Sequence, residues 1–275
     1  MRALPDSTWL GRGLTFSLTL SLALALVACA HTSAPNLPAT RWDAFASADV
    51  VLLGEQHDAP DHHAIEREAV EQFAASGRLA ALALEMADQG RDTRQLPPSA
   101  TEGDVREALQ WNARGWPWAR YGPTVMAAVR AGVPVLGANL PRTGLGPAMG
   151  DAALDGLLPP NALAVQRQAI RDGHCNLLPE SQIGPMTRVQ IARDRAMATT
   201  LVAAVQPGRT VLLVAGAAHV DRELGVPRHL PAILRVQAVK LQAGAPDPRA
   251  GAFDAVWPTP ALPARDHCAG VKPPG

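Results

Sequence analysis

The sequence has few aromatic residues and no excess of charge of either sign. Phe, Trp and Tyr together make up 4% of the 275 residues, and Tyr121 is the single tyrosine. The 25 basic residues balance the 25 acidic ones, so no electrostatic attraction to nucleic acid is expected. Hydrophobic residues make up 47% of the chain, which is ample for one large core. The composition therefore favours a globular domain without a nucleic-acid partner.

Sequence motifs of several common enzyme classes are missing as well. The chain contains no Walker A glycine-lysine loop, no Rossmann glycine fingerprint and no Gly-x-Ser-x-Gly nucleophile elbow. It also shows no internal repeat of solenoid length. Serine-hydrolase chemistry, and nucleotide binding through these loops, therefore have no visible anchor in the sequence.

The longest apolar run lies near the N-terminus. Leu14–Ala28 is almost uninterrupted, but it is shorter than the roughly 20 residues that a membrane-spanning helix needs. It ends in Leu26-Val27-Ala28-Cys29, which resembles the bacterial lipobox, where small residues precede a cysteine that receives lipid. An uncleaved anchor with an incidental cysteine is the alternative interpretation.

The lipobox resemblance divides the chain into three parts. We predict a lipoprotein signal peptide over residues 1–28, a tether rich in Pro, Ser and Thr over residues 29–40, and one domain over residues 41–275 that ends in a loop-rich tail. Acylated Cys29 would anchor the chain in outer-membrane lipid, because no aspartate follows the cysteine to retain it at the inner membrane. The predicted location is the cell envelope, on the periplasmic side of the outer membrane.

The other cysteines form an even pair. Cys175 and Cys268 are left once Cys29 carries lipid. In an oxidising compartment such a pair is expected to form a disulfide, which would tie the C-terminal tail to the body of the domain. Two free thiols are the alternative, because the sequence alone cannot bring their Cα atoms within reach.

Short apolar runs alternate with helical patterns along the rest of the chain. The predicted strands cover residues 50–53, 79–84, 133–137, 210–215 and 233–239, and residues 253–257 are a candidate edge strand. The predicted helices cover residues 60–76, 123–131, 161–172 and 185–205. This alternation predicts a single α/β domain with a mainly parallel sheet of about five strands flanked by helices. The polar residues of the last helix, Gln190 and Asp194 among them, are interpreted as a solvated face.

Acidic residues and histidines follow three of the predicted strands. Glu55 and His57 come after the first strand, Glu85 after the second and His219 after the fourth. Both histidines stand in a Gly-x-x-His pattern, in which the glycine permits close backbone approach at the strand end. The carboxyl ends of parallel strands meet at one edge of the sheet, where ligands bind. The four side chains are therefore predicted to converge there.

Two chemistries fit this convergence. The four side chains can bind one divalent metal, such as zinc or manganese, and activate a water for ester or amide hydrolysis. Alternatively, Glu55 acts as a general base without any metal. The plainer interpretation is that these polar groups satisfy one another, with Glu85 capping a turn. His62 and His63 are expected to face solvent on the first turn of the next helix, and the alternative is that they belong to one of the binding sites.

Large aromatic residues gather in one segment. Trp111, Trp116, Trp118 and Tyr121 fall within eleven residues of a chain that is otherwise poor in aromatics. One interpretation is a hydrophobic lid over a flat ligand, and the other is a satellite core beneath a long connection. The residues alone leave both interpretations open.

Several of these motifs occur together in a known family. The motifs are Gly54-Glu55-Gln56-His57-Asp58, Leu84-Glu85-Met86, Asn139-Leu140-Pro141-Arg142, Gly173-His174-Cys175, the helix with Met186, Gln190 and Asp194, and Ala215-Gly216-Ala217-Ala218-His219 with Gly225-Val226-Pro227. With these motifs in this order, and with the lipobox, the chain from about Trp42 to Val239 resembles the ChaN family of iron-regulated, haem-binding lipoproteins. That family belongs to the wider Tiki/erythromycin-esterase-like superfamily.

The resemblance implies an α/β sheet flanked by helices, and haem binding in bacterial iron or haem acquisition. It implies a haem held between the two protomers of a homodimer through a tyrosinate axial ligand, and Tyr121 matches that position. Trp116 and Trp118 are then the residues that stack on the porphyrin, and Arg114 or Arg120 pairs with a propionate unless both are plain surface charges. Because related members of the superfamily are hydrolases, a metal-dependent hydrolase is the alternative function.

Overall fold

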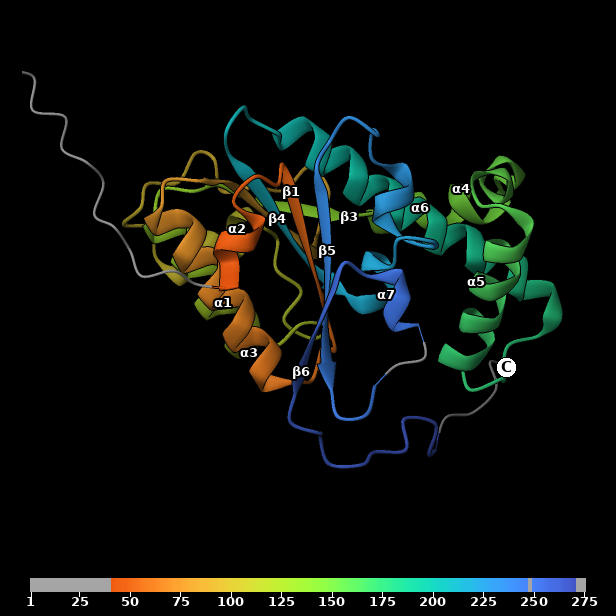
Figure 1. The fold of residues 1–275 in the computed structure, drawn as a ribbon. Coiled ribbons are helices and arrows are strands. Elements are labelled where there is room, and N and C mark those ends of the chain that lie inside the picture. Colours follow the sequence, from red (N-terminus) through yellow and green to blue (C-terminus); the bar gives the residue numbers. More distant parts are fainter. Residues whose placement is uncertain (1–40, 247–248, 271–275) are drawn as a thin grey trace, which may run out of the picture. The chain divides into compact units, whose positions relative to one another are not determined.

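A six-stranded sheet forms the centre of the domain (Figure 1). The structure, a computed structural model, describes residues 41–246 and 249–270. The strands are β1 (Val50–Glu55), β2 (Leu79–Asp88), β3 (Val135–Asn139), β4 (Thr210–Gly216), β5 (Val236–Ala243) and β6 (Ala255–Thr259). They are ordered β3-β2-β4-β1-β5-β6, and every neighbouring pair is parallel. The predicted α/β class is confirmed, with six strands in place of about five because the candidate edge strand forms β6.

Helices cover both faces of the sheet. α1 (Pro60–Ala75), α2 (Glu102–Ala108) and α3 (Trp118–Arg130) lie on one face, and α6 (Glu180–Ala204) lies on the other (Figure 1). α4 (Leu145–Gly150) and α5 (Pro160–Gly173) pack against α6, and α7 (Ala217–Val220) follows β4 directly. The described residues also form short 3-10 helices at Arg41–Phe45, Arg142–Gly144, Ala152–Leu157, Val226–His229 and Ala250–Ala252.

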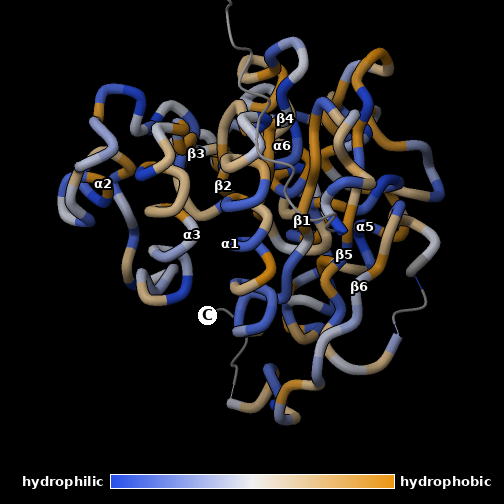
Figure 2. Tube along the Cα trace, turned by 60° about the vertical axis from the view of Figure 1, so that its left-hand side comes forward, coloured by the Kyte–Doolittle hydropathy of each residue, from blue (hydrophilic) through white to orange (hydrophobic). Residues whose placement is uncertain are grey.

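Alternate side chains of the central strands enter two separate apolar layers. Val51 and Leu53 of β1 pack in the same layer as Phe73 of α1, whereas Leu52 packs in the layer of Leu201 of α6. All five side chains are fully buried, and burial of each stabilises the fold by about 1.5–3 kcal/mol. The strands are the hydrophobic segments at the centre of Figure 2. Because neighbours along a strand point to opposite faces, the same alternation decides which way a polar residue at a strand end points.

Two helices begin earlier than the sequence predicts. Proline is favoured at the first position of a helix, so Pro123 and Pro185 predict the starts of two helices. In the structure both prolines lie inside helices, because α3 begins at Trp118 and α6 begins at Glu180. Each proline removes one backbone N–H near the N-terminal end of its helix, and tertiary packing outweighs that loss. Tyr121 therefore lies inside α3 rather than before it.

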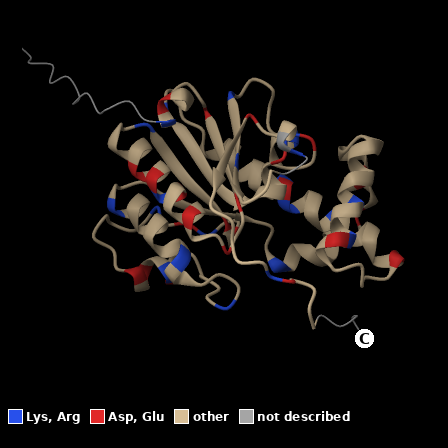
Figure 3. Ribbon diagram, turned by 60° about the horizontal axis from the view of Figure 1, so that its bottom comes forward, with Lys and Arg blue, Asp and Glu red and all other residues tan. Residues whose placement is uncertain are grey.

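Acidic and basic residues are interspersed on the helices, as Figure 3 shows. Within the described ranges, residues 41–246 and 249–270, no helix is both long and apolar enough to cross a bilayer. The predicted signal peptide, the tether and Cys29 lie outside these ranges, so they stay predictions.

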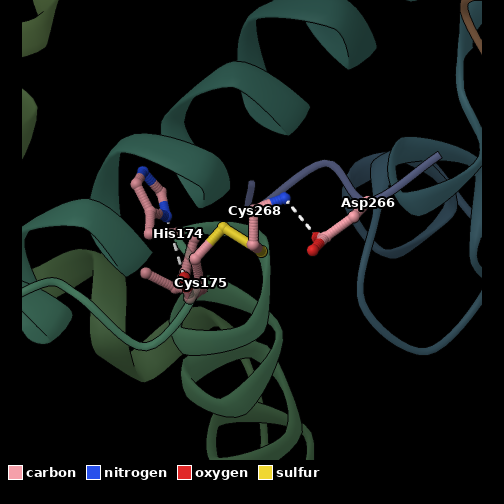
Figure 4. Close-up of a disulfide and its surroundings, with 5 residues drawn as sticks. His174, Cys175, Asp266 and Cys268 are labelled. Carbon is pink, nitrogen blue, oxygen red and sulfur yellow. Dashed lines mark hydrogen bonds between the residues drawn. A yellow bond between two sulfur atoms is a disulfide. The ribbon is translucent and has the colours of Figure 1, made fainter. Parts of the chain in front are cut away.

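A disulfide joins the turn after α5 to the C-terminal tail. Cys175 and Cys268 are bonded, with their Cα atoms 5.6 Å apart (Figure 4). Beside the bridge, the backbone N–H of Cys268 donates to Asp266 Oδ1 at 2.9 Å. The segment that follows β6 is therefore linked covalently to the helical layer of α5 and α6, as the even cysteine pair predicts.

Candidate functional site

Two glycines allow the strand ends to pack closely. A Cβ on Gly54 would lie 2.9 Å from the Cα of Ala217 and 3.1 Å from the Cβ of Val220, so α7 rests directly on the end of β1. A Cβ on Gly216 would lie 2.9 Å from His57 Nε2. The imidazole of His57 therefore lies over the end of β4 only because residue 216 has no side chain. These contacts explain why a glycine stands at each of the two Gly-x-x-His positions, Gly54 and Gly216.

Strand alternation sends Glu55 and Glu85 to opposite faces of the sheet, Glu55 at the end of β1 and Glu85 inside β2, which runs on to Asp88 beyond the predicted strand end. Glu55 follows Val51 and Leu53 on the face covered by α1 and α3. Glu85 lies between Leu84 and Met86, which belong to that same layer, so Glu85 itself points toward α6. The four predicted residues, Glu55, His57, Glu85 and His219, line one cavity of about 560 Å³ at this edge of the sheet. Their hydrogen bonds divide them into two clusters, with His57 between them.

We call the first group the Glu85 cluster and define it as Glu85, His219 and Asp194. His219 donates from Nδ1 to Asp194 Oδ1 at 2.6 Å, and its Nε2 lies 3.3 Å from Glu85 Oε1. The backbone N–H of Gly216 donates to Glu85 Oε2 at 2.7 Å. All three side chains are buried. The imidazole is thus held between two carboxylates, and Asp194 Oδ2 is buried without a hydrogen bond among the described residues.

Electrostatics hold the Glu85 cluster in charged form. Burial raises the pKa of Glu85, but the charge and hydrogen bond of His219, the charge of His57 and the backbone N–H of Gly216 together outweigh burial and lower that pKa to about 2. Burial lowers the pKa of His219, but Glu85 and Asp194 outweigh it and raise that pKa to about 10. Burial raises the pKa of Asp194 to about 6 in spite of the nearby imidazole. At neutral pH the cluster is therefore an imidazolium between carboxylates, which makes a poor general base.

We call the second group the Glu55 cluster and define it as Glu55, His63 and Glu66. Glu55 Oε1 accepts hydrogen bonds from His57 Nδ1 at 2.7 Å and from the Tyr121 hydroxyl at 2.8 Å. Glu55 Oε2 lies 3.1 Å from His63 Nε2, but the two atoms are not aligned as a hydrogen bond. Glu66 is 0% exposed, and neither of its oxygens has a hydrogen-bond partner among the described residues.

The pKa values around Glu55 diverge. Burial raises the pKa of Glu55, but contacts with His57 and His63 outweigh burial and lower it to about 2. Burial and the neighbouring charge of Glu55 raise the pKa of Glu66 well above its usual range. Burial, together with the charge of Glu55, also raises the pKa of the Tyr121 hydroxyl. Tyr121 is therefore neutral at physiological pH, and its hydroxyl donates a hydrogen bond to Glu55.

His57 is the site histidine that is most open to a ligand. Its side chain is 39% exposed, its ring packs edge-on against Trp116 at 4.9 Å, and Nε2 lies 3.9 Å from Glu85 Oε2, beyond hydrogen-bond distance. Burial lowers the pKa of His57, but Glu55 and Glu85 together raise it. The ring lines a cavity of about 560 Å³ at the strand ends, together with Glu85, His219 and Lys240.

The aromatic segment packs around Tyr121. Trp111 and Trp118 contact each other at 5.0 Å between ring centroids, and Trp116 lies 5.9 Å from the Tyr121 ring. All three tryptophans are partly buried against the core on the α1 side of the sheet. Tyr121 itself is only 1% exposed. The satellite-core interpretation therefore describes Trp111 and Trp118, and Trp116 is the tryptophan that also contacts His57.

A second cavity opens between α1 and α3. It has a volume of about 550 Å³ and is lined by His63, Arg67, Arg120 and Asp58, among others. The neighbouring His62 does not face solvent, as the sequence suggests, because Gln56 N–H donates to its Nδ1 at 2.9 Å and its Nε2 lies 3.0 Å from Thr259 Oγ1. The expectation of two solvent-facing histidines is wrong: His62 is buried and His63 belongs to the Glu55 cluster.

Three residues of the site were not predicted from the strand-end pattern. Asp194 is fully buried, and Gln190 Nε2 lies 3.2 Å from His219 Nδ1. These two residues of α6, which the sequence pattern predicts to be solvent-exposed, therefore face the site. Their spacing of four residues puts both on one side of a helix, which is a usable signal. The corresponding signal for Glu66 is its position three residues after His63.

Comparisons with known proteins agree with this fold. Residues 41–230 match the model of a family described as haem-binding uptake, Tiki superfamily, ChaN. A solved structure described as cofacial heme binding to ChaN of Campylobacter jejuni is 24% identical, with a TM-score of 0.63 over 74% of this chain and 85% of that one. The type III effector HopBA1 aligns over 78% of this chain and 88% of its own at 12% identity, with a TM-score of 0.41. No curated protein sequence matches.

Proposed function

The chain belongs to the ChaN family of haem-binding uptake proteins in the Tiki superfamily, and on that basis we propose that it binds haem for bacterial iron or haem acquisition. The family match carries the proposal. It spans β1 to β4 and includes every residue of the Glu85 and Glu55 clusters. Haem is the cargo in this proposal, and its ferric iron needs a protein ligand at an accessible position.

His57 fits the role of axial ligand best. Iron-binding histidines commonly donate their second ring N–H to a carboxylate, which fixes the ring and makes the other nitrogen a better donor to the metal. Glu55 provides that carboxylate, because His57 Nδ1 donates to it at 2.7 Å. The other nitrogen, Nε2, belongs to a ring that lines the strand-end cavity.

Tyr121 fits a supporting role better than the axial position that the family resemblance implies. Its hydroxyl would have to leave Glu55, become exposed and lose a proton whose pKa is raised. In its present position it holds Glu55 by a hydrogen bond of 2.8 Å, and Glu55 in turn holds His57. The axial tyrosinate stays a prediction that the haemin experiment below tests directly.

Basic and aromatic groups beside His57 suit the rest of the porphyrin. Trp116 offers an apolar surface next to the imidazole. Arg120 donates from its guanidinium to the backbone oxygen of His57 at 3.2 Å and lines the cavity between α1 and α3 together with Arg67. Guanidinium groups pair well with carboxylates, so these two arginines are the candidate partners of the propionates.

A homodimer would enclose the cargo more fully. Both cavities are open to solvent, so one chain leaves part of a flat ligand uncovered. The heme of the Campylobacter jejuni protein is bound cofacially, and we extend that arrangement to two copies of this chain. Light scattering on addition of haemin is expected to show the mass rise from one chain to two, and an unchanged mass would contradict the dimer.

Attachment to the outer membrane through Cys29 is part of the proposal. The lipobox-like sequence supports it, and the bond between Cys175 and Cys268 fits an oxidising compartment such as the periplasm. Cells that express the chain and are fed labelled palmitate are expected to label it. Label should be lost in Cys29→Ala and kept in Cys268→Ala, and label in Cys29→Ala would contradict lipidation.

The haem proposal is tested by titrating the purified chain with haemin and following absorbance. We expect saturation near one haem per chain, and at least about a tenfold loss of affinity in His57→Ala. His267→Ala, which removes an exposed histidine of the tail, is the matched control and should bind as the wild type does. Tyr121→Phe keeps the buried ring and removes the hydroxyl.

Each outcome assigns the ligand or rejects the proposal. Loss of the ferric haem spectrum in Tyr121→Phe but not in His57→Ala would assign Tyr121, and not His57, as the axial ligand. Unsaturable binding that is equal in all variants would contradict haem binding at this site.

Hydrolysis is the second candidate function. The observation in its favour is that all four residues of the predicted set, Glu55, His57, Glu85 and His219, line one cavity of about 560 Å³. Without a metal, the charged forms of Glu85 and His219 at neutral pH disfavour acid–base catalysis by that pair. Release of nitrophenol from nitrophenyl esters, measured with and without added Zn²⁺ or Mn²⁺ and lost in Glu85→Gln, would support this candidate. No release under either condition would reject it for esters.

A further inference from the structure

We propose that the Glu55 cluster is a binding site for one divalent cation of the zinc or manganese class. The ligands are Glu55 Oε2, His63 Nε2 and a carboxylate oxygen of Glu66. The site lies on the α1 side of the sheet, next to His57 and Tyr121, which both bind the other oxygen of Glu55. It goes beyond the proposed haem function and does not depend on it, because its ligands are other atoms and its ion is held inside the fold.

The backbone brings the three ligand atoms together. Glu55 closes β1 and points to the face that α1 covers, and His63 and Glu66 stand three residues apart on α1. That spacing puts both side chains on one side of the helix. One ligand atom from each residue can be chosen so that all three lie within 4.8 Å of one another. This spacing is what three ligands around one ion require.

The ligand atoms lack other partners. Glu55 Oε2, His63 Nε2 and both oxygens of Glu66 are buried without a hydrogen bond among the described residues. Glu66 is 0% exposed, so bulk solvent does not reach its carboxylate. Buried carboxylates are strongly destabilising unless they are paired, hydrogen-bonded or bound to a metal. Glu66 therefore has no aligned hydrogen-bond partner beside Glu55 and His63, and a cation bound between the three residues would provide one.

The chemistry of the donors selects the ion. Two carboxylate oxygens and one imidazole nitrogen suit zinc or manganese, whereas calcium and magnesium prefer oxygen alone. Second contacts already orient Glu55, because Tyr121 and His57 both donate to its other oxygen, Oε1. Such outer hydrogen bonds are typical of metal ligands, since they fix the direction of the donor atom.

An entry path exists on the α1 side. His63 lines the cavity of about 550 Å³ between α1 and α3, and its side chain is 10% exposed. The same cavity is bordered by carboxylates and guanidinium groups of both signs, Asp58, Glu68, Glu71, Arg67 and Arg120. Glu66 lies deeper, so a cation would reach it past the His63 imidazole.

One competing explanation has to be separated from the cation. A proton shared between the carboxyls of Glu55 and Glu66 would also relieve their repulsion. Glu66→Gln discriminates, because an amide keeps the size of the side chain and can donate a hydrogen bond to Glu55, as a protonated carboxyl would. The same amide removes the anionic ligand that a cation needs.

The experiment uses the purified full chain, stripped with EDTA and dialysed. Calorimetric titration with ZnCl₂ and with MnCl₂ is expected to show one saturable site per chain for at least one of the ions. We expect affinity to fall at least about tenfold in Glu66→Gln, given that even outer contacts of metal sites contribute about 10–100-fold. Glu107→Gln, an exposed position on α2 away from the cavity, is the matched control and should bind as the wild type does.

The outcomes separate the explanations. No saturable cation binding in the wild type, with Glu66→Gln equally stable, would overturn the proposal in favour of a shared proton. Equal binding in wild type and Glu66→Gln would overturn it by putting the ion elsewhere.

A second measurement keeps the proposal testable if Glu66→Gln fails to fold. Crystals of the zinc-loaded wild type should give an anomalous peak, at the zinc edge, between Glu55, His63 and Glu66. A peak between His57, Glu85 and His219 instead would overturn the proposal. Haem plays no part in either measurement, so failure here leaves the haem proposal intact and failure of haem binding leaves this one intact.

Discussion

The Glu85 cluster and the Glu55 cluster contain the same chemical groups and differ in how those groups are paired. Each has two buried carboxylates and one imidazole at the carboxyl edge of the sheet, on opposite faces. In the Glu85 cluster the imidazole of His219 reaches both carboxylates, at 2.6 Å and 3.3 Å. In the Glu55 cluster His63 reaches one carboxylate at 3.1 Å without alignment, and Glu66 has no hydrogen bond.

The difference shows that the residue types of a polar cluster do not reveal its role. The Glu85 cluster has nearly all of its hydrogen bonds within the protein, so it contributes to the fold as it stands. The Glu55 cluster leaves polar atoms unsatisfied on three residues, and a group from outside can satisfy them. The number of aligned hydrogen bonds that each buried polar atom makes, rather than the number of charged residues, distinguishes a structural ion network from a binding site.

The largest effect is expected from removing the imidazole of the Glu85 cluster. His219→Leu leaves Glu85 and Asp194 buried without their counter-ion, so we expect the free energy of unfolding to fall by about 3–5 kcal/mol. Urea denaturation measures it. The parallel variant His63→Leu should lose roughly 1 kcal/mol or less, because Glu55 keeps its hydrogen bonds from His57 and Tyr121. Equal losses would remove the distinction between the clusters.

The pH dependence of stability is the next expected effect. The pKa of His219 is raised from 6.5 to about 10, so its contribution is complete below pH 6.5 and is lost as the pH rises toward 10. The pKa of Glu85 is lowered from 4.5 to about 2, so its contribution is complete above pH 4.5 and is lost as the pH falls toward 2. Urea midpoints measured in EDTA between pH 6 and pH 10 should fall in the wild type. A fall of the same size in His219→Gln would contradict this assignment.

A smaller effect of opposite sign is expected in the Glu55 cluster. Glu66→Met replaces an unpartnered buried carboxylate by an apolar side chain of similar length, so the EDTA-treated variant should match the wild type or exceed it by up to about 2 kcal/mol. Thermal unfolding measures this. Added Zn²⁺ or Mn²⁺ should raise the melting temperature of the wild type alone. A large loss of stability in EDTA would show that Glu66 already has a stabilising partner.

The smallest expected effect concerns His62, which belongs to neither cluster. Its Nε2 lies 3.0 Å from Thr259 Oγ1 on β6, so Thr259→Val should lower the free energy of unfolding by about 1 kcal/mol. Haemin and cation affinities should stay at wild-type values. A change in either affinity would mean that the edge strand controls the site, and the separation of His62 from the clusters would be wrong.

The sequence predicts which residues stand at the strand ends but not which of them meet. Glu55 and Glu85 are recognisable because each ends an apolar run, and the parallel order of the strands brings both to one edge. Their side chains point to opposite faces because the alternate residues of β1 and β2 enter different apolar layers. The register of β2 against β4 is irregular near Ala81, so the face that Glu85 points to does not follow from counting along the strand. That register is set by packing against β4, which no local pattern encodes.

Partners that lie far along the chain were the least predictable. Asp194 is one of several charged residues on α6, and only tertiary packing distinguishes it as the buried partner of His219. The helix starts predicted at Pro123 and Pro185 are wrong, because burial of the preceding residues outweighs the local preference for proline in the first turn. The core strands, by contrast, follow from apolar runs that only a doubly covered sheet can bury.

The strand order also governs when this site can exist during synthesis. β1 emerges first, yet its two neighbours are β4 and β5, and the family match at residues 41–230 ends before β5 begins. A nascent chain therefore keeps both edges of β1 unpaired until nearly all of the chain has been synthesised. Such distant pairing slows folding and leaves these edges open to edge-to-edge association. A fragment cut at residue 230 would keep the edge that pairs with β5 permanently open.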